Sequence, residues 1–178
     1  MAYLTTPKLI FPIDDYQVNG APFGKRSVYN GVVWGLHLGE DCLAEAGTDV
    51  RAIGRGRVVY SAFHPGTGEK GNWGNIIIIR HKQAKTRRVF YSVYAHLGKC
   101  FKLIGEKVDL GEPLGFIGEG NTPENGFWPA HLHFAIYIGP WRDEVLPGYW
   151  KEGDQRTRPE WWQKPSDFIK QYLDQHAD

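Results

Sequence analysis

Two histidines stand one residue apart in PAHLHFAIY (129–137), a segment that is otherwise apolar. In an extended strand, residues two apart share a face, so His131 and His133 point to one side and the apolar residues between them to the other. An imidazole can bind a divalent metal ion or transfer a proton near neutral pH. A histidine in a strand is also often a hydrogen-bonded structural residue, so the pair needs partners from elsewhere in the chain.

A second pair of candidate donors lies far upstream. His37 and Asp41 are four residues apart in HLGED (37–41). This spacing places both side chains on one side of a strand, and also on one side of a helix. The glycines at positions 35 and 39 favour an extended or looped backbone. We therefore expect the two side chains to share one face of an extended segment.

A further imidazole ends a predicted strand in YSVYAHLG (91–98). Regular alternation gives His96 the same face as Tyr94 and Ser92. The same alternation predicts that three apolar residues face the core: Val93, Ala95 and Leu97. The chain thus offers polar donors from three separate elements.

Two imidazoles and a carboxylate provide the three protein ligands of a catalytic zinc site, whose fourth position holds water. A structural zinc site would be closed by four ligands, usually rich in cysteine. Cys42 and Cys100 have neither CxxC spacing nor that of a cysteine zinc site, and they are compatible with a disulfide or with free thiols. The sequence holds no HExxH motif, so a helix-borne glutamate base is not indicated.

Composition limits the possible classes of function. The chain has 178 residues, 21 basic and 20 acidic side chains and a net charge of +1, which gives no overall field for nucleic acid or an anionic membrane. The longest aliphatic run, residues 76–79, is far shorter than the roughly 20 residues of a membrane-spanning helix. We expect one domain over residues 1–178, no transmembrane segment and no secretory signal in its first residues.

Short apolar runs between scattered glycines and prolines predict a mainly β fold. The expected strands are 56–61, 75–81, 89–97, 107–109, 114–118 and 131–138, and the basic segment 80–88 reads as an exposed hairpin tip. One helix is predicted near the carboxyl end in PSDFIKQYLDQ, with Ser166 as its N-cap. The tryptophan-rich segment 141–165 reads as a loop attached to the domain.

The order of the motifs resembles that of the lysostaphin-type (LytM-like) zinc endopeptidases, which cleave bacterial cell-wall peptides. The similar segments are HLGED (37–41), GTDVRAIGRGRV (47–58), GNIIIIRH (74–81), YAHL (94–97), GEKVDLGEPLGFIG (105–118) and HLHF (131–134). The resemblance covers roughly residues 11–137, and several separated motifs in one order rarely arise by chance. The chain differs from the family at Ala130 and Ala135, where a proline and an acidic residue are usual, and these differences bear on substrate preference.

The resemblance implies that His37, Asp41 and His133 bind one zinc ion per chain and that His131 and His96 are the catalytic pair. It implies small antiparallel sheets with an open groove, a metallopeptidase core over residues 11–140, and a loop and short helix over 141–178. It further implies a zinc-dependent endopeptidase that hydrolyses peptide bonds in bacterial peptidoglycan stems or cross-bridges. A location in the cell envelope, periplasmic or secreted, follows from that substrate.

Two other functions are compatible with parts of the sequence. Some relatives keep this fold but lose ligands and act as non-catalytic cell-wall-binding or hydrolase-activator modules, whereas this chain retains all five residues. The segment GEKVDLGEPLGFI also suggests a lipoyl- or biotinyl-carrier domain, which has no use for several histidines.

The remaining polar and aromatic residues have simpler expected roles. Trp73, Phe127 and Trp128 either line the groove or act as packing anchors. We expect a structural histidine at 81, an exposed turn histidine at 64, a tail histidine at 176, an asparagine that satisfies loop backbone at 75, and solvated carboxylates at 40, 45 and 119.

Overall fold

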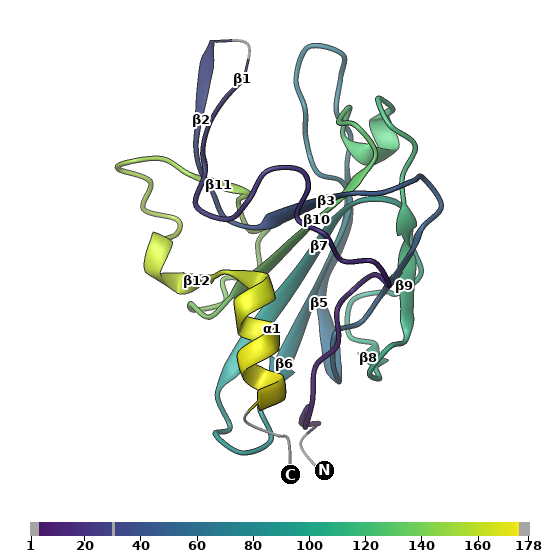
Figure 1. The fold of residues 1–178 in the computed structure, drawn as a ribbon, viewed down its shortest axis with the longest axis vertical. Coiled ribbons are helices and arrows are strands. Elements are labelled where there is room, and N and C mark those ends of the chain that lie inside the picture. Colours follow the sequence, from purple (N-terminus) through teal and green to yellow (C-terminus); the bar gives the residue numbers. More distant parts are fainter. Residues whose placement is uncertain (1–3, 30, 175–178) are drawn as a thin grey trace.

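Two antiparallel sheets dominate the computed structural model, which describes residues 4–29 and 31–174 (Figure 1). The larger sheet has nine strands, with the central order β12-β10-β7-β6-β5-β8. Outside this central order, β3 pairs with β10, and β9 pairs with both β4 and β7. The smaller sheet has the order β1-β2-β11. A mainly β fold with antiparallel sheets and one carboxyl-terminal helix is therefore confirmed.

All six predicted strands are present. They are β5 (Gly56–His64), β6 (Gly74–Lys82), β7 (Val89–Cys100), β8 (Lys107–Val108), β9 (Pro113–Ile117) and β10 (His131–Tyr137). The segment between β6 and β7 forms the expected hairpin, whose tip at residues 85–88 is exposed. The sequence reading missed six short strands: β1 (Arg26–Tyr29), β2 (Val32–His37), β3 (Glu40–Leu43), β4 (Asp49–Arg51), β11 (Tyr149–Trp150) and β12 (Trp162–Gln163).

The large sheet is buried on both faces. Along β6, Ile77 and Ile79 belong to one apolar cluster while Ile76 and Ile78 belong to a second. This explains the uninterrupted isoleucine run, because a strand covered on both faces does not alternate between apolar and polar residues. The first cluster includes Ile169 and Tyr172 of α1 (Pro165–Asp174), and the second includes Trp162.

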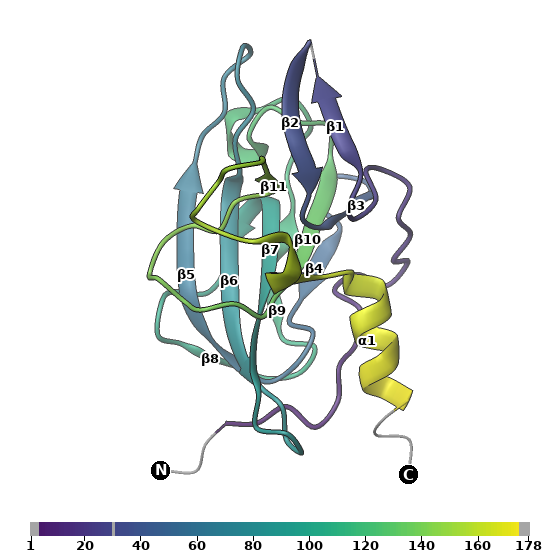
Figure 2. The same cartoon turned by 90° about the vertical axis from the view of Figure 1, so that its left-hand side faces the viewer.

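The tryptophan-rich segment is part of the fold, so its interpretation as an attached loop is wrong. Its strand β11 pairs with β2, and β12 pairs with β10. The chain between them crosses one face of β6 and β7 (Figure 2). Buried apolar side chains, among them Leu146 and Trp162, fix the segment to the second cluster.

The predicted helix is confirmed, but Ser166 is not its N-cap. The helix begins at Pro165, and Ser166 donates from both its hydroxyl and its backbone N–H to the Glu40 carboxylate, at 2.8 and 2.9 Å. The Tyr16 hydroxyl also donates to Glu40, at 2.7 Å. Glu40 is only 1% exposed, so its prediction as a solvated carboxylate is wrong. A carboxylate can be buried here because helix N-terminal and hydroxyl donors satisfy it.

Cys42 and Cys100 are free thiols. Among the described residues, no helix has the length and apolar character needed to span a membrane.

Candidate metal centre

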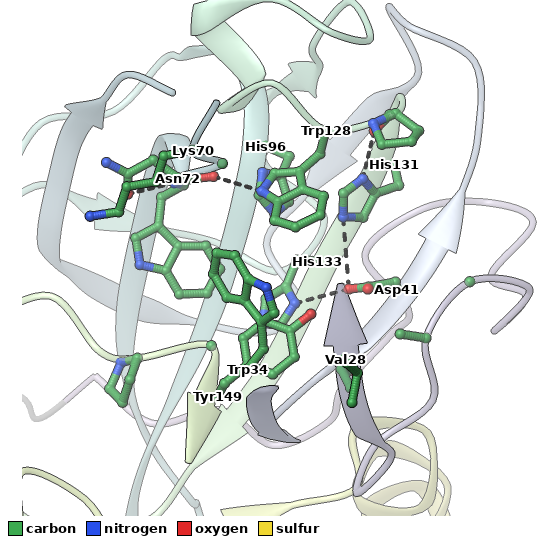
Figure 3. Close-up of a pocket in the computed structure, with 18 of the residues that line it drawn as sticks. Val28, Trp34, Asp41, Lys70, Asn72, His96, Trp128, His131, His133 and Tyr149 are labelled. Carbon is green, nitrogen blue, oxygen red and sulfur yellow. Dashed lines mark hydrogen bonds and ion pairs between the residues drawn. The ribbon is translucent and has the colours of Figure 1, made fainter. Parts of the chain in front are cut away.

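Three predicted donors, His37, Asp41 and His133, converge on one point at the end of the large sheet. Figure 3 shows two of them, Asp41 and His133, facing each other. His133 Nδ1 lies 3.0 Å from His37 Nε2 and 2.9 Å from Asp41 Oδ1. His37 Nε2 and Asp41 Oδ1 are 3.2 Å apart. The three atoms form a nearly equilateral triangle, although 96 residues separate His37 from His133.

Strand pairing creates this convergence. In the β3–β10 ladder Asp41 lies directly opposite His133, so the two side chains project from neighbouring strands on one face. His37 is the last residue of β2, and residues 38 and 39 separate it from β3. The expectation that His37 and Asp41 share one extended segment is therefore only partly correct, because a break between two strands turns them toward each other.

The hydrogen bonds of His37 aim its second nitrogen at the centre. His37 Nδ1 donates to the Pro22 carbonyl oxygen at 3.2 Å, and since a carbonyl only accepts, Nε2 is left with a lone pair. If the ring is protonated, Nε2–H instead donates to Asp41 Oδ1, which is 3.2 Å away; in the neutral ring the lone pair faces that oxygen. Two acceptors this close repel each other unless a cation lies beside them.

Burial and the hydrogen bonds set the charges of the centre. Burial opposes ionisation of Asp41, but hydrogen bonds with His133 and His37 outweigh it and hold the pKa of the carboxyl well below its usual range. Burial lowers the pKa of His133 to about 4, although Asp41 acts in the opposite direction. At neutral pH the carboxylate is ionised and the imidazole is neutral, which are the forms that bind metal ions.

The donor set fits zinc. Zinc accepts imidazole nitrogen and carboxylate oxygen at about 2.0–2.2 Å in tetrahedral geometry, so neighbouring ligand atoms lie about 3.3 Å apart. The observed edges of 2.9, 3.0 and 3.2 Å are close to this value. A three-ligand set leaves one position of a tetrahedron to solvent or substrate.

Two further imidazoles stand beside this centre. The rings of His96 and His131 are 4.3 Å apart, and His131 Nε2 is 3.8 Å from Asp41 Oδ1. The Nδ1 of His96 donates to the Asn125 carbonyl at 2.8 Å and that of His131 to the Pro129 carbonyl at 2.6 Å. Each Nε2 therefore carries a lone pair. Burial, followed by the charges of His131 and His133, lowers the pKa of His96 well below its usual value.

His96 does not follow the alternation expected from the sequence. Tyr94 lies in the first apolar cluster, and its hydroxyl accepts from the Ile53 backbone N–H, whereas Ala95 lies in the second cluster, on the side of the metal centre. His96 adopts a positive φ of 63°, and the pairing registers of β7 shift beside it. Because of this bulge, the consecutive residues Ala95 and His96 both face the side of the metal centre, and His96 lies beside His131.

Comparison with known proteins identifies the chain. Residues 35–145 match Peptidase family M23. This chain belongs to peptidase family M23. The match contains all five side chains described above and confirms the family resemblance seen in the sequence.

Curated relatives of this M23 chain include peptidases of the bacterial cell wall. It is 33% identical over 118 residues to the DD-carboxypeptidase/endopeptidase Mpg of Neisseria gonorrhoeae, an alignment that covers 66% of this chain and 24% of that protein. It is 31% identical over 102 residues to the peptidoglycan DD-endopeptidase ShyA of Vibrio cholerae, covering 57% of this chain and 20% of ShyA. The matched region thus spans about a quarter or less of the length of these relatives.

Solved structures confirm the M23 fold. The catalytic domain of lysostaphin from Staphylococcus simulans superposes with a TM-score of 0.53 at 24% identity, covering 85% of this chain and 90% of that one. A zinc-containing peptidase from Vibrio cholerae gives 0.55 at 24% identity, covering 80% and 39%.

A cleft of about 640 Å³ opens above the candidate metal centre, and Asp41 and His133 are among its lining residues. The β1–β2 hairpin stands at the same end of the molecule as the 65–73 loop (Figure 1). Of the three aromatic residues for which the sequence left groove lining and packing open, Trp73 and Trp128 line the cleft, whereas Phe127 is not among its lining residues. The sequence reading missed Trp34 and Tyr149, which also line it. Trp34 could have been suspected because it lies three residues before His37.

Tyr149 packs directly on one of the converging histidines. Its ring lies 5.2 Å from that of His37, and burial together with the Asp41 carboxylate raises the pKa of Tyr149 to about 12. The phenol is therefore protonated at neutral pH. The pairing of β11 with β2 brings this residue from the carboxyl-terminal segment to the centre.

The remaining predicted residues lie away from the centre or support it indirectly. His81 is buried and hydrogen bonds to the Arg55 carbonyl and to the Ser92 hydroxyl, as a structural histidine would. Asn75 donates to the carbonyls of Leu97 and Gly98 at the bulge, which confirms its backbone role. His64 is not an exposed turn residue as predicted: it is the half-buried last residue of β5 and hydrogen bonds to the Tyr60 hydroxyl. Glu45 and Glu119 are exposed as expected, and His176 lies outside the described residues.

Proposed function

We propose that this chain is a zinc-dependent endopeptidase that hydrolyses peptide bonds in bacterial peptidoglycan stems or cross-bridges. The observation that carries the proposal is the triangle of His37, Asp41 and His133 donor atoms beside two imidazoles, His96 and His131, whose Nδ1 atoms are held by backbone carbonyls. His37, Asp41 and His133 would hold one zinc ion per chain. Such an ion polarises a carbonyl group and lowers the pKa of bound water toward about 7.

His96 and His131 would handle protons and developing charge. Their backbone partners fix each ring with Nδ1 protonated, so each Nε2 can accept a proton from the attacking water or, once protonated, donate to the carbonyl oxygen or the leaving amine. Because both rings flank one centre at a separation of 4.3 Å, one can accept while the other donates. The low pKa of His96 favours its neutral, accepting form.

The names of the relatives support the choice of substrate. Mpg is a DD-carboxypeptidase/endopeptidase and ShyA a peptidoglycan DD-endopeptidase, so a cross-link between D-amino acids is the first bond to test. A substrate in the wall would place the protein in the cell envelope, periplasmic or secreted. The cleft has no strong excess of charge and several aromatic walls, which suits a peptide held by its backbone.

The alternative role as a non-catalytic wall-binding or activator module has less support. A module that only binds has no need of two proton-accepting imidazoles beside a three-donor centre. It would bind sacculi without releasing peptides.

The deciding experiment incubates the purified protein with sacculi of D-alanine and of glycine cross-link chemistry and identifies the released peptides by mass spectrometry. We expect about one zinc per chain by elemental analysis and new peptide termini from one type of sacculus. Binding without release of peptides would favour the module and refute the endopeptidase.

Two variants test the assigned roles separately. His133→Ala should lose zinc because two donors remain. His131→Ala should keep zinc but lose activity by about 10²-fold or more, because it removes a proton-transfer group and no ligand. Full zinc in the first variant, or unchanged turnover in the second, would contradict the corresponding role.

A further inference from the structure

Trp34 has ring contacts with aromatic residues on both sides of the cleft. It lies on β2, and its indole is 5.6 Å from the Trp128 ring across the cleft and 5.6 Å from the Tyr149 ring beside it. Figure 3 shows the Trp34 indole between these two rings, close to His133. The contact between Trp34 and Trp128 joins the β2 wall to the loop that precedes β10.

The indole N–H of Trp34 is buried and has no acceptor among the described residues. This contrasts with other indoles of the chain. Trp128 donates to the Asn72 carbonyl, Trp141 to Asp143 and Trp162 to the Thr157 hydroxyl, at 2.6 to 3.1 Å. Apart from Trp34 Nε1, His133 Nε2 is the only buried side-chain nitrogen or oxygen without a partner in the described part of the chain, and it belongs to the ring whose Nδ1 is part of the donor triangle.

An unsatisfied donor is unfavourable for the free protein. Burying an N–H group without an acceptor costs free energy, so such groups are rare in native structures and often have a role outside folding. A phenylalanine at this position would avoid the cost and keep an aromatic contact. Because Trp34 lines the cleft, a molecule bound there can supply the missing acceptor once it displaces a neighbouring ring.

We propose that Trp34 is a substrate-binding residue whose indole N–H donates to a backbone carbonyl oxygen of the bound peptide. A peptide entering the cleft would separate Trp34 from Trp128 and expose the N–H to that carbonyl. The acceptor is an uncharged peptide carbonyl, because the surrounding rings of Trp128 and Tyr149 offer little stabilisation to a charge. This inference rests on the proposed peptidase function and names how its site holds the substrate.

The two effects of removing the N–H should have opposite signs. The free protein loses an unsatisfied polar group and becomes more stable. The enzyme–substrate complex loses a hydrogen bond, so KM rises. A residue with a purely structural role would lose stability and leave KM unchanged.

The experiment replaces single tryptophans with benzothienylalanine, which has the shape of tryptophan with sulfur in place of the N–H group. At position 34 we expect the melting temperature of the zinc-loaded protein to rise by about 2–4 °C. With a D-alanine-cross-linked muropeptide dimer, we expect kcat/KM to fall about tenfold, mainly through KM. The same replacement at position 162 is the matched control: it breaks the bond to Thr157, so stability should fall while KM stays unchanged.

Binding is also measured without hydrolysis. Disaccharide-tetrapeptide monomer, added to nitrogen-labelled protein, should shift the indole N–H signal that is missing in Trp34→Phe. A Trp34 signal that does not move, or a position-34 variant that loses stability and keeps its KM, would overturn the proposal. If wild-type protein hydrolyses no muropeptide, the peptidase function fails, and the shift of the indole signal still decides whether Trp34 binds peptide.

Discussion

Gly39 leaves no space for a side chain beside the metal centre, and adding one methyl group there should weaken metal binding. A Cβ atom at position 39 would lie 2.7 Å from both Cε1 and Nε2 of His133. It would also lie 2.7 Å from the Phe134 carbonyl oxygen, which belongs to β10. Ordinary contacts of this kind are about 3.5 Å, so Gly39→Ala creates overlaps of about 0.8 Å.

The overlap determines the expected magnitude. The Phe134 carbonyl is part of the β3–β10 ladder and cannot move freely, so the His133 ring has to move by most of the 0.8 Å. Metal–ligand distances tolerate only about 0.2 Å, so the triangle of donors is distorted. We expect zinc affinity to fall about 10- to 100-fold, or about 1.4–2.7 kcal/mol, and the free energy of unfolding to fall by about 1–3 kcal/mol.

The assay is competition for zinc against a chromophoric chelator, combined with denaturant unfolding of the metal-free protein. Gly68→Ala is the matched control, because a Cβ at that exposed position meets nothing within 4 Å. If Gly39→Ala bound zinc as tightly as Gly68→Ala, the packing of Gly39 against His133 would not determine the position of that ligand, and the reasoning would be refuted.

Two other predictions concern buried polar groups outside the metal centre. Glu40→Gln should lower the free energy of unfolding, measured by urea titration, by about 3 kcal/mol, because three hydrogen-bond donors lose a charged acceptor. The control Glu45→Gln, at an exposed site, should change it by less than about 0.5 kcal/mol. Burial lowers the pKa of His81 to about 4, below the unfolded value of about 6.5, so its contribution to stability is fully present above pH 6.5 and is lost as the pH falls to 4. Wild type should therefore lose about 3 kcal/mol more than His81→Asn between pH 7 and pH 4; equal losses would show that His81 does not resist protonation.

The large sheet could be predicted because its strands carry strong local signals. Residues 76–79, for example, are four consecutive β-branched isoleucines. Because this strand is buried on both faces, every position in the run is apolar, and such a run is easily recognised as a strand. The missed strands are two to six residues long, and apart from the β1–β2 hairpin they pair with distant segments. Strand β11 contains only Tyr149 and Trp150 and is too short to show an alternation of apolar and polar residues. These two residues form a strand because they pair with β2. Long-range pairing of this kind is absent from local periodicity.

In the candidate site, too, some features could be predicted from the sequence and others could not. The expected grouping of His37, Asp41 and His133 came from family motifs, while residue spacing alone left several donor sets open. Alternation gave the wrong face for His96, because a bulge adds one residue to β7 at that point. Asn75 holds the bulge through the carbonyls of Leu97 and Gly98, and its position in sequence gives no hint of that partner.

Glu40 and Asp41 show why neighbouring residues of one type can have different roles. Successive side chains of a strand point to opposite faces, so Asp41 reaches the metal centre while Glu40 reaches the N-terminus of α1. In the ladder with β10, Asp41 lies opposite His133 and Glu40 opposite Phe134. A shift of one residue in this register would exchange the two carboxylates, burying Asp41 against α1 and presenting Glu40 to His37 and His133. The hydrogen bonds from Tyr16 and Ser166 to Glu40 therefore help to fix the register on which the metal centre depends, although none of the three residues touches it.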